Sequence, residues 1–329
     1  MNRIKKIIVS FCENNSLFSH LLNWYRLQRL KTIIKVDPRQ LANNVYRQVF
    51  HKNINWENPS NLIEKIYWLQ LFSDTSLWTI CADKYRVREY LQSRNLEHLL
   101  PQLYGCWSDS KDIDFSKLPN QFVIKTTNGC GQVLVVKDKK ELNIKDVRTL
   151  LNNWMKLKYG FDDAQIHYSK IIPSIIAEQY LVNVADESKN IVDYKIWCLN
   201  GQVEYVLCVY DRVILGENKG YRLAAFDKDW NDISAKCLKQ KYCGDEKIPK
   251  PFHFNEMIET AELIANDFLQ VRVDFYDTIQ RLYLGELTFT TGYGYHTDDF
   301  YEYLGSKLDL SMASRVCTMN RIDESFLYL

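Results

Sequence analysis

The chain has 329 residues, of which 46% are hydrophobic and 25% charged, with 42 Lys and Arg against 41 Asp and Glu. This composition excludes wholesale disorder, and a net charge of +1 argues against a dedicated nucleic-acid binder. Nine cysteines without a C-x-x-C pair and six scattered histidines argue against a disulfide framework or a zinc hydrolase, and favour a reducing cytoplasm.

The N-terminal segment 1–35 contains seven basic residues and a single acid, Glu13. Ile4, Ile7 and Ile8 fall at helical spacing, which predicts an amphipathic helix. A basic helix of this kind suits an anionic surface, so peripheral contact with the inner membrane face is one interpretation. The simpler interpretation is a helix packed on the protein with its basic side in water.

Helical patterns continue between residues 36 and 100. Asn58-Pro59-Ser60 predicts the start of one helix, and a second helix is expected to begin near Ala82-Asp83 and to carry Lys84. A loop is predicted from Pro101 to Pro119.

After residue 120 the pattern changes to short β-type runs. Strands are expected over 121–125, 132–136, 175–181, 193–199, 203–210, 271–276 and 282–289. Helices are expected over 140–158 and 254–269. This order predicts an α+β fold with mostly antiparallel sheets.

The first expected hairpin carries a lysine and a glycine-bearing tip. Lys125 precedes Asn128-Gly129-Cys130-Gly131, whose backbone N–H groups could donate to phosphate oxygens while the lysine supplies charge. The segment matches neither the P-loop nor the dinucleotide-binding fingerprint. Taken alone, an ordinary Asn-Gly hairpin turn explains it as well.

The last two strands carry a pair of carboxylates. Strand alternation places Arg272 and Asp274 on one face, and Glu286 and Thr288 on one face of the partner strand. If the two strands pair, Asp274 stands beside Glu286, and their repulsion requires a cation or an arginine. Hard oxygen ligands near a phosphate site suit Mg²⁺, whereas a solvated face with an Arg272 salt bridge is the alternative.

The order and spacing of these pieces, with Asp274 and Glu286 twelve residues apart, resemble the ATP-grasp layout. More narrowly, the chain resembles the teichuronopeptide-biosynthesis-type, or TupA-like, ATP-grasp family between about Asn58 and Leu308. The segments that carry the resemblance are 58–59 with 64–69, 82–90, 118–125, 193–195, 271–276 and 285–289.

The resemblance implies an ATP-grasp fold, in which two α+β subdomains with antiparallel sheets clasp ATP after a mostly helical N-terminal region. The implied organisation is an N-terminal region 1–57, a helical part 58–120, a lid subdomain 121–180, a subdomain with the metal site 181–310, and a tail 311–329.

The resemblance also implies a role for each site residue. The residues implied to bind ATP are Lys84 and Lys125 at its phosphates, Asn128, Gly129 and Gly131 in a lid over them, and Glu178, Gln179, Tyr180 and Leu181 at the adenine. Two magnesium ions are implied at Asp274, Glu286 and Thr288. The basic residues implied to neutralise the transferred phosphate or an anionic substrate are Lys195, Arg212 and Arg272. Many ATP-grasp ligases have an asparagine where Thr288 stands, so the second metal is expected to bind less firmly or through water.

The family implies a carboxylate–amine ligase that makes an amide through an acyl phosphate. Its setting suggests a uronic acid of a cell-surface polysaccharide precursor as the acid and an amino acid as the amine, with no nucleic-acid partner. Two other functions stay open: a kinase that phosphorylates a glycan, and an inactive nucleotide-binding scaffold in polysaccharide assembly. A glycosyltransferase has less support, because Asp112-Ile-Asp114 is a short motif in an expected loop.

Overall fold

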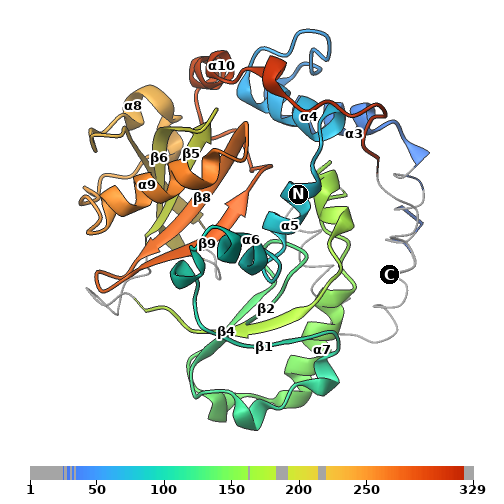
Figure 1. Cartoon of the computed structure of the whole chain (residues 1–329), viewed down its shortest axis with the longest axis vertical. Helices are drawn as coiled ribbons and strands as arrows, with labels where there is room; N and C mark the ends of the chain where they lie inside the picture. The colour runs from blue at the N-terminus through green and yellow to red at the C-terminus, as the bar shows by residue number, and fades with distance from the viewer. Residues whose placement is uncertain are drawn as a thin grey trace.

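The computed structural model describes residues 35–161, 164–182, 192–213 and 220–321 together with Tyr25, Gln28, Arg29 and Thr32; at Arg212 and Val213 it describes the backbone only. The predicted helix of residues 1–35 therefore lies almost wholly outside the described residues. Figure 1 shows a larger sheet with helix α9, a smaller sheet with helix α7, and α5 and α6 between the two sheets. No helix among the described residues is long and apolar enough to span a membrane.

The smaller sheet has four antiparallel strands in the order β1-β4-β2-β3. Its strands are β1 (Leu103–Trp107), β2 (Phe122–Thr126), β3 (Val133–Val136) and β4 (Ile175–Glu178). Helix α7 (Ile144–Met155) begins at Asn143, whose side chain accepts hydrogen bonds from the amides of the first turn. Its apolar side packs on Phe122, Ile124 and Ala177, so the opposite face of the sheet, with Lys125 and Glu178, is left for other contacts.

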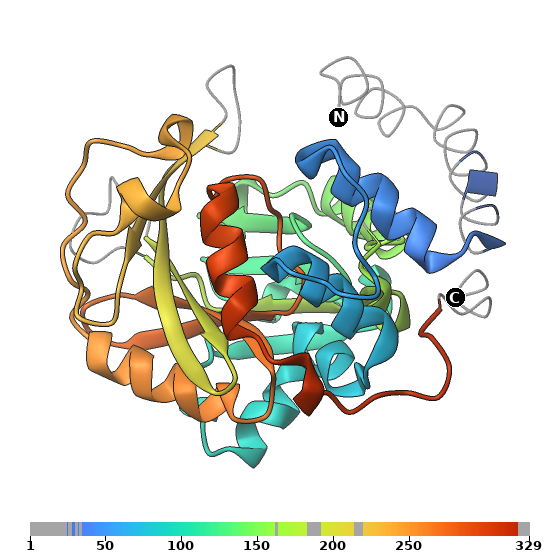
Figure 2. The same ribbon diagram turned by 90° about the horizontal axis from the view of Figure 1, so that it is seen from above.

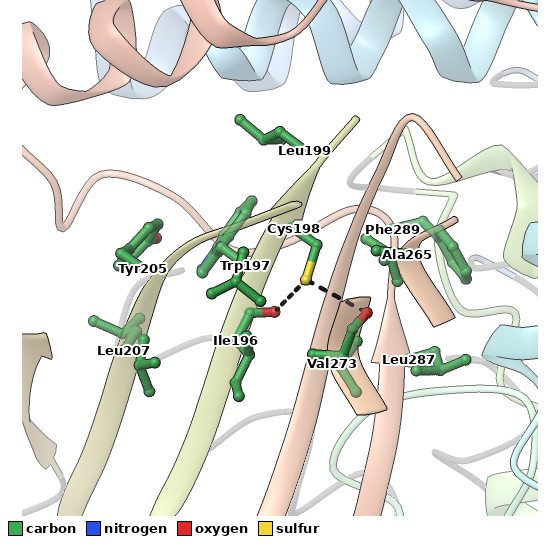
Figure 3. Packing of buried hydrophobic residues seen from close by; sticks show 14 of the residues in the cluster. Ile196, Trp197, Cys198, Leu199, Tyr205, Leu207, Ala265, Val273, Leu287 and Phe289 are labelled. Atoms are coloured by element: carbon green, nitrogen blue, oxygen red, sulfur yellow. Dashed lines mark hydrogen bonds between the residues drawn. The ribbon is translucent and has the colours of Figure 1, made fainter. Parts of the chain in front are cut away.

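The larger sheet has five antiparallel strands in the order β7-β6-β5-β8-β9. They are β5 (Asp193–Leu199), β6 (Gln202–Val213), β7 (Gly220–Phe226), β8 (Gln270–Asp277) and β9 (Leu282–Thr288). Helix α9 (Phe254–Ala265) packs on one face of this sheet, where the Cys198 Sγ of β5 lies 3.8 Å from the carbonyl oxygen of Ala261. Figure 3 shows Cys198 among the buried apolar residues of this face. Strand alternation therefore places Lys195 and Asp274 on the other face.

The β5–β6 hairpin turns at Asn200-Gly201, as the sequence predicts. Both residues have positive φ, 49° and 78°. A two-residue turn with two positive φ angles is the type I′ turn, which Asn-Gly adopts more readily than other dipeptides. The turn sets the register of β5, and so it sets which residues of β5 share a face with Asp274.

The helical N-terminal part packs over one end of the larger sheet. It consists of α3 (Pro38–Phe50), α4 (Leu62–Phe72), α5 (Ser76–Ala82) and α6 (Val87–Ser93), and the short α8 (Ser234–Cys237) and α10 (Asp298–Lys307) follow later. Figure 2 shows α10 beside α4. This contact brings the C-terminal part of the chain back to the helical region.

The structure corrects two of the expected local elements. No helix carries Lys84: α5 ends at Ala82, and the Asp83 carboxylate accepts from the amides of Tyr85 and Arg86 in a turn before α6. This side-chain bond competes with helix continuation, as aspartate at a helix end often does. The predicted loop 101–119 contains β1, because Leu103–Trp107 pairs with β4 as an edge strand.

Candidate active site

A pocket lies between the two sheets. The smaller sheet contributes Lys125 and Glu178, and the larger sheet contributes Leu284, Gly285 and Glu286. The rest of the lining comes from the segment around α5 and α6 and from the residues before β1, namely Cys81, Ala82, Lys84, Val87, Arg88, Leu100 and Pro101. Pieces far apart in the sequence thus bring three cations and two carboxylates to one place.

Two of the lysines predicted to bind ATP, Lys84 and Lys125, line the pocket. The Lys84 Nζ donates to the carbonyl oxygen of Gly129, and Lys125 forms an ion pair with Glu178. Burial lowers the pKa of Lys84 below its ordinary value, and the neighbouring ammonium of Lys125 lowers it further, while Glu286 opposes them. A buried ammonium next to a second cation gains stability when an anion such as a phosphate arrives.

Arg88 is a pocket residue whose role the sequence did not reveal. Its Nη2 lies 3.4 Å from Glu178 Oε2 and donates to the Pro101 carbonyl at 3.0 Å, whereas its buried Nε has no hydrogen-bond partner among the described residues. A buried donor without a partner is costly unless a ligand or water satisfies it. One signal was present in the sequence: Arg88 lies one helical turn after Lys84 in a segment that carries the family resemblance.

The carboxylate pair forms as predicted. Asp274 pairs with Glu286 across β8 and β9, and a β-bulge directly after Asp274 accommodates Gly285. A Cβ atom at Gly285 would lie 2.7 Å from the ring of Tyr276, so this close approach requires glycine. The bulge aims Glu286 into the pocket, a common use of bulges beside active sites.

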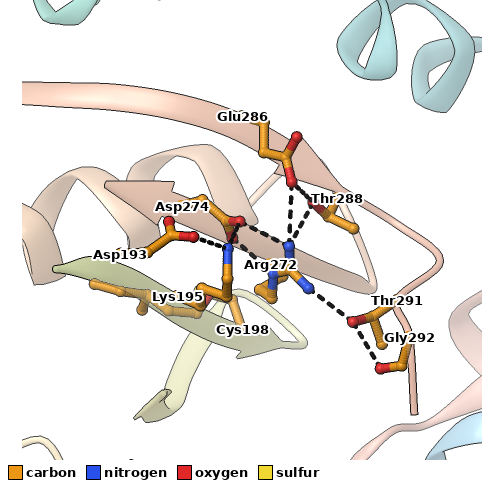
Figure 4. A network of polar contacts seen from close by, with 10 residues as sticks. Asp193, Lys195, Cys198, Arg272, Asp274, Glu286, Thr288, Thr291 and Gly292 are labelled. Carbon is orange, nitrogen blue, oxygen red and sulfur yellow. Dashed lines mark hydrogen bonds and ion pairs between the residues drawn. The ribbon is translucent and has the colours of Figure 1, made fainter. Parts of the chain in front are cut away.

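Arg272 compensates the two carboxylates, as Figure 4 shows. Its Nε and Nη2 donate to the two oxygens of Asp274 at 2.6 and 2.7 Å, and Nη2 also lies 3.3 Å from Glu286 Oε1 and 3.0 Å from Thr288 Oγ1. Lys195 forms ion pairs with Asp274 and, at 2.8 Å, with Asp193. The alternative, a solvated face with an Arg272 salt bridge, is thus half right: the Arg272 salt bridge is present, but Asp274 is only 1% exposed, so the face around it is not solvated.

The pKa values of the two carboxylates in this network are shifted in opposite directions. Burial raises the pKa of Asp274, against the opposing effect of Arg272 and Lys195. Burial would also raise the pKa of Glu286, but the cations Lys195, Arg272 and Lys84 outweigh it and lower the pKa to about 2. Glu286 is therefore ionised at any ordinary pH, as a metal ligand must be.

The residues fit a magnesium ion held together with phosphate oxygens. Across the described residues, no group of three or more His, Cys, Asp or Glu side chains is placed to hold a metal by itself. Mg²⁺ commonly takes only one or two carboxylates and completes its shell with water and substrate phosphates. Asp274 and Glu286 supply those two carboxylates, and the Thr288 hydroxyl, 3.1 Å from Glu286 Oε1, is the third predicted ligand.

The glycine-bearing loop contacts Lys84. Gly131 has a φ of 88°, and the Asn128 side chain donates to the carbonyl of Leu157 at 2.9 Å. Because Lys84 bonds to the Gly129 carbonyl oxygen, this loop is held against a lysine of the pocket.

The predicted adenine segment follows β4. The amide of Gln179 donates to the carbonyl of Gln102 at 2.9 Å, and the side chain of Glu178 is engaged by Lys125 and Arg88. With respect to the residues that the structure describes, the backbone groups of Tyr180 and Leu181 make no hydrogen bond.

An apolar surface beside Lys125 was missed by the sequence reasoning. Val133 and Val135 pair with Lys125 and Val123 on β2, so all four share one face of the smaller sheet. The two valines of β3 are 42% and 45% exposed. The signal was present, because Gln132-Val-Leu-Val-Val136 is apolar on both faces.

The remaining predicted residue, Arg212, belongs to β6, but its side chain lies outside the described part of the chain. Its predicted role therefore stays a prediction.

A family model, described as TupA-like ATPgrasp, matches residues 64–309. The chain belongs to the TupA-like ATP-grasp family. The match covers both sheets, the pocket and the carboxylate pair, and it confirms the predicted family and fold. ATP with magnesium is the pair that ATP-grasp proteins bind.

Three solved structures similar to this TupA-like protein share a low sequence identity with it. D-alanine–D-alanine ligase from Bacillus anthracis is 18% identical, with a TM-score of 0.43 over 73% of this chain and 65% of that one. The ATP-grasp ligase PsnB with its minimal precursor is 14% identical, with a TM-score of 0.39 over 70% and 60%. D-cycloserine synthetase DcsG is 11% identical, with a TM-score of 0.40 over 72% and 73%.

The chain spans slightly less than two thirds of the length of the first two of these structures. No curated protein matches the chain by sequence.

Proposed function

We propose that this TupA-like protein is an ATP- and magnesium-dependent carboxylate–amine ligase that forms an amide through an acyl phosphate. The observation that supports this best is the pocket between the sheets, where Lys84, Lys125 and Arg88 share a lining with the carboxylate of Glu286. Cations that bind polyphosphate and carboxylates that bind magnesium are the two parts that phosphoryl transfer requires.

The three cations would bind the phosphates of ATP. Lys84 and Lys125 reach the pocket from different elements, and Arg88 keeps an unpartnered Nε there. Hydrogen bonds between a charged donor and phosphate are shorter and stronger than neutral ones, and an arginine adds geometric fit. Binding of phosphate would release Lys125 from Glu178.

Magnesium bound at Asp274 and Glu286 would neutralise phosphate charge. We propose two ions, of which the second would bind more weakly because its ligand at Thr288 is a hydroxyl. Arg272 and Lys195 would meet the charge that develops on the transferred phosphoryl group, because both are already held against Asp274. The backbone on either side of Gly129 would exclude water above the phosphates.

The reaction has two balanced steps. A substrate carboxylate oxygen attacks the γ-phosphorus, the bond from phosphorus to the β-bridging oxygen breaks, and ADP leaves. An amine nitrogen then attacks the acyl carbon, the carbon–oxygen bond to phosphate breaks, and phosphate leaves while the nitrogen loses a proton. No protein nucleophile takes part.

The proposed acid is a uronic acid of a cell-surface polysaccharide precursor, and the proposed amine is an amino acid. The proposed location is the cytoplasm, with peripheral contact between the basic segment 1–35 and the inner membrane face. Both statements follow from the family resemblance rather than from the geometry of the pocket.

Product analysis tests the proposal. The full chain is incubated with Mg·ATP, a uronic-acid oligosaccharide and a mixture of amino acids, and free phosphate and amide product are measured. A ligase releases one phosphate for each amide. Phosphate retained on the glycan would show a kinase instead. Mg·ATP binding without turnover of any substrate would favour the inactive nucleotide-binding scaffold.

A further inference from the structure

The hydrogen bonds of Arg272 fall into two groups. Its Nε and Nη2 donate to Asp274, Glu286 and Thr288, which are the three predicted magnesium ligands. Its Nη1 donates to the hydroxyl of Thr291 at 2.7 Å, as Figure 4 shows. Of the hydrogen-bond partners of Arg272 in the described part of the chain, only Thr291 is not a predicted metal ligand.

The hydroxyl of Thr291 is oriented toward Arg272. Its single hydrogen is donated to the carbonyl oxygen of Gly292 at 3.1 Å, so the hydroxyl oxygen meets Arg272 as an acceptor. Thr291 is 9% exposed and Arg272 is 8% exposed. The contact is therefore a buried hydrogen bond with a charged donor, which is stronger than a bond between neutral groups.

The loop that carries Thr291 is anchored on both sides of it. Before Thr291, the Phe289 ring stacks on Trp78, with centroids 5.1 Å apart and planes 13° from parallel. After Thr291, the amide of Gly294 donates to the hydroxyl of Tyr301 at 2.7 Å. These contacts fix the backbone around Thr291, so its hydroxyl meets Arg272 at a defined place.

Magnesium would compete with only one of the two groups of bonds. A magnesium ion takes carboxylate oxygens as ligands, and Asp274 and Glu286 are the oxygens to which Nε and Nη2 of Arg272 now donate. The bond from Nη1 to Thr291 lies outside that set and is retained. Thr291 is thus the partner that still holds the guanidinium when the metal is bound.

We propose that Thr291 is a positioning residue, which holds Arg272 in place for the transferred phosphoryl group once magnesium occupies Asp274 and Glu286. The inference rests on the proposed ligase function and adds a residue that had no assigned role. Arg272 meets the phosphoryl group, and Thr291 acts through Arg272. If Thr291 only satisfied a buried guanidinium, its loss would affect the binding of every ligand alike.

The neighbouring Thr290 provides a matched control. It is 8% exposed, and its hydroxyl has no hydrogen-bond partner among the residues that the structure describes. Valine keeps the branched shape of threonine and removes the hydroxyl at either position. Comparing Thr290→Val with Thr291→Val therefore separates the bond to Arg272 from the general effect of removing a buried hydroxyl in this loop.

The test compares two ligands of the full chain: Mg·ADP, and Mg·ADP with aluminium fluoride, which mimics a phosphoryl group in transfer. Calorimetry measures both affinities. We expect Thr291→Val to weaken the aluminium fluoride complex about tenfold or more, the loss typical of one hydrogen bond with a charged group, and to change the affinity for Mg·ADP less than about twofold. Thr291→Ser keeps the hydroxyl and should bind both ligands within about threefold of wild type. Thr290→Val is expected to bind both like wild type.

Urea unfolding of each variant checks that it is folded. If Thr291→Val does not fold, Thr291→Cys replaces it, because a thiol is a weaker acceptor than a hydroxyl. It should weaken the aluminium fluoride complex at least about threefold, again with little change for Mg·ADP.

Three results overturn the positioning role and leave the nucleotide site intact. They are an equal loss for both ligands in Thr291→Val, an aluminium fluoride complex as strong in Thr291→Val as in wild type, and Thr291→Ser as weak as Thr291→Val. Wild type that binds Mg·ADP without any gain from aluminium fluoride also overturns it, because Arg272 then meets no phosphoryl group. Wild type that binds neither ligand refutes the nucleotide site of the proposed function itself.

Discussion

The two sides of the pocket handle charge in opposite ways. On one side, Lys125 and Arg88 both form ion pairs with Glu178, Lys84 bonds instead to the Gly129 carbonyl oxygen, and the buried Nε of Arg88 has no partner among the described residues. On the larger sheet, Asp274 is enclosed by Arg272 and Lys195, and the carboxylate is almost fully buried.

This difference indicates on which side of the pocket ion pairs would break when ligands bind. The nucleotide side has surplus positive charge and can accept phosphate by releasing one ion pair. On the larger sheet Asp274 is already engaged by Arg272 and Lys195, so a magnesium ion would have to share it with Arg272, whereas 42% of the Glu286 side chain is exposed. Stability should therefore depend on Asp274, and metal binding on Glu286.

Replacing Asp274 by alanine should give the largest effect. The change leaves Arg272 and Lys195 buried without their main counter-charge, which costs about 3–5 kcal/mol in free energy of unfolding. Urea unfolding measures it, with Asp229→Ala, an exposed aspartate, as the control. A loss below about 1 kcal/mol would mean that the network is solvated.

Replacing Glu286 by glutamine should separate activity from stability. The amide oxygen can still accept from Thr288 and Arg272, and 42% of the Glu286 side chain is exposed to screening solvent, so the loss in free energy of unfolding should be smaller than that of Asp274→Ala. Magnesium-dependent phosphate release should fall by about a hundredfold or more, because a metal ligand is lost. Retained activity would remove Glu286 from the metal site.

Replacing Arg88 by methionine should weaken ATP binding without abolishing turnover. One charged hydrogen-bond donor to phosphate is worth about 1.5–3 kcal/mol, which corresponds to an increase of about tenfold to a hundredfold in the KM for ATP. The control is Arg86→Met, since Arg86 is exposed and lies 3.9 Å from Glu89. If both variants behave alike, Arg88 is structural.

The smallest effect concerns pH. The pKa of Glu286 is lowered to about 2 from an ordinary value of 4.5, so its contribution to stability is fully present above pH 4.5 and is lost as the pH falls toward 2. The difference in Tm between wild type and Glu286→Gln should be constant from pH 5 to 8 and change only below about 4.5. A change near pH 6 would show that the cations around Glu286 do not act on it as described.

Local sequence patterns correctly predicted two features of strand pairing that are set by short hairpins. The pairing of Asp274 with Glu286 follows from alternation and a short hairpin, and the β5–β6 register follows from Asn200-Gly201. Both depend on residues close in sequence, and both are confirmed.

Features set by distant contacts were not predictable in this way. Strand β1 exists because β4, some 70 residues later, offers an edge, and Arg88 faces the pocket because α6 packs between the sheets. The bulge at Gly285 and the helix break at Asp83 each depend on one residue. At Gly285 a close contact with Tyr276 overrides the local pattern, and at Asp83 a hydrogen bond from its side chain does so. The active-site residues were recognised largely through the family resemblance, and Arg88 had no assigned role.

The most direct test is thermal unfolding of the full chain with and without Mg·ATP, on wild type, Glu286→Gln and the exposed control Glu259→Gln. At a ligand concentration of about a hundred times Kd, wild type and the control should gain about 2.7 kcal/mol, while the gain should be largely lost in Glu286→Gln. Folded wild type that is indifferent to Mg·ATP would contradict the assignment of the pocket between the two sheets as a nucleotide site.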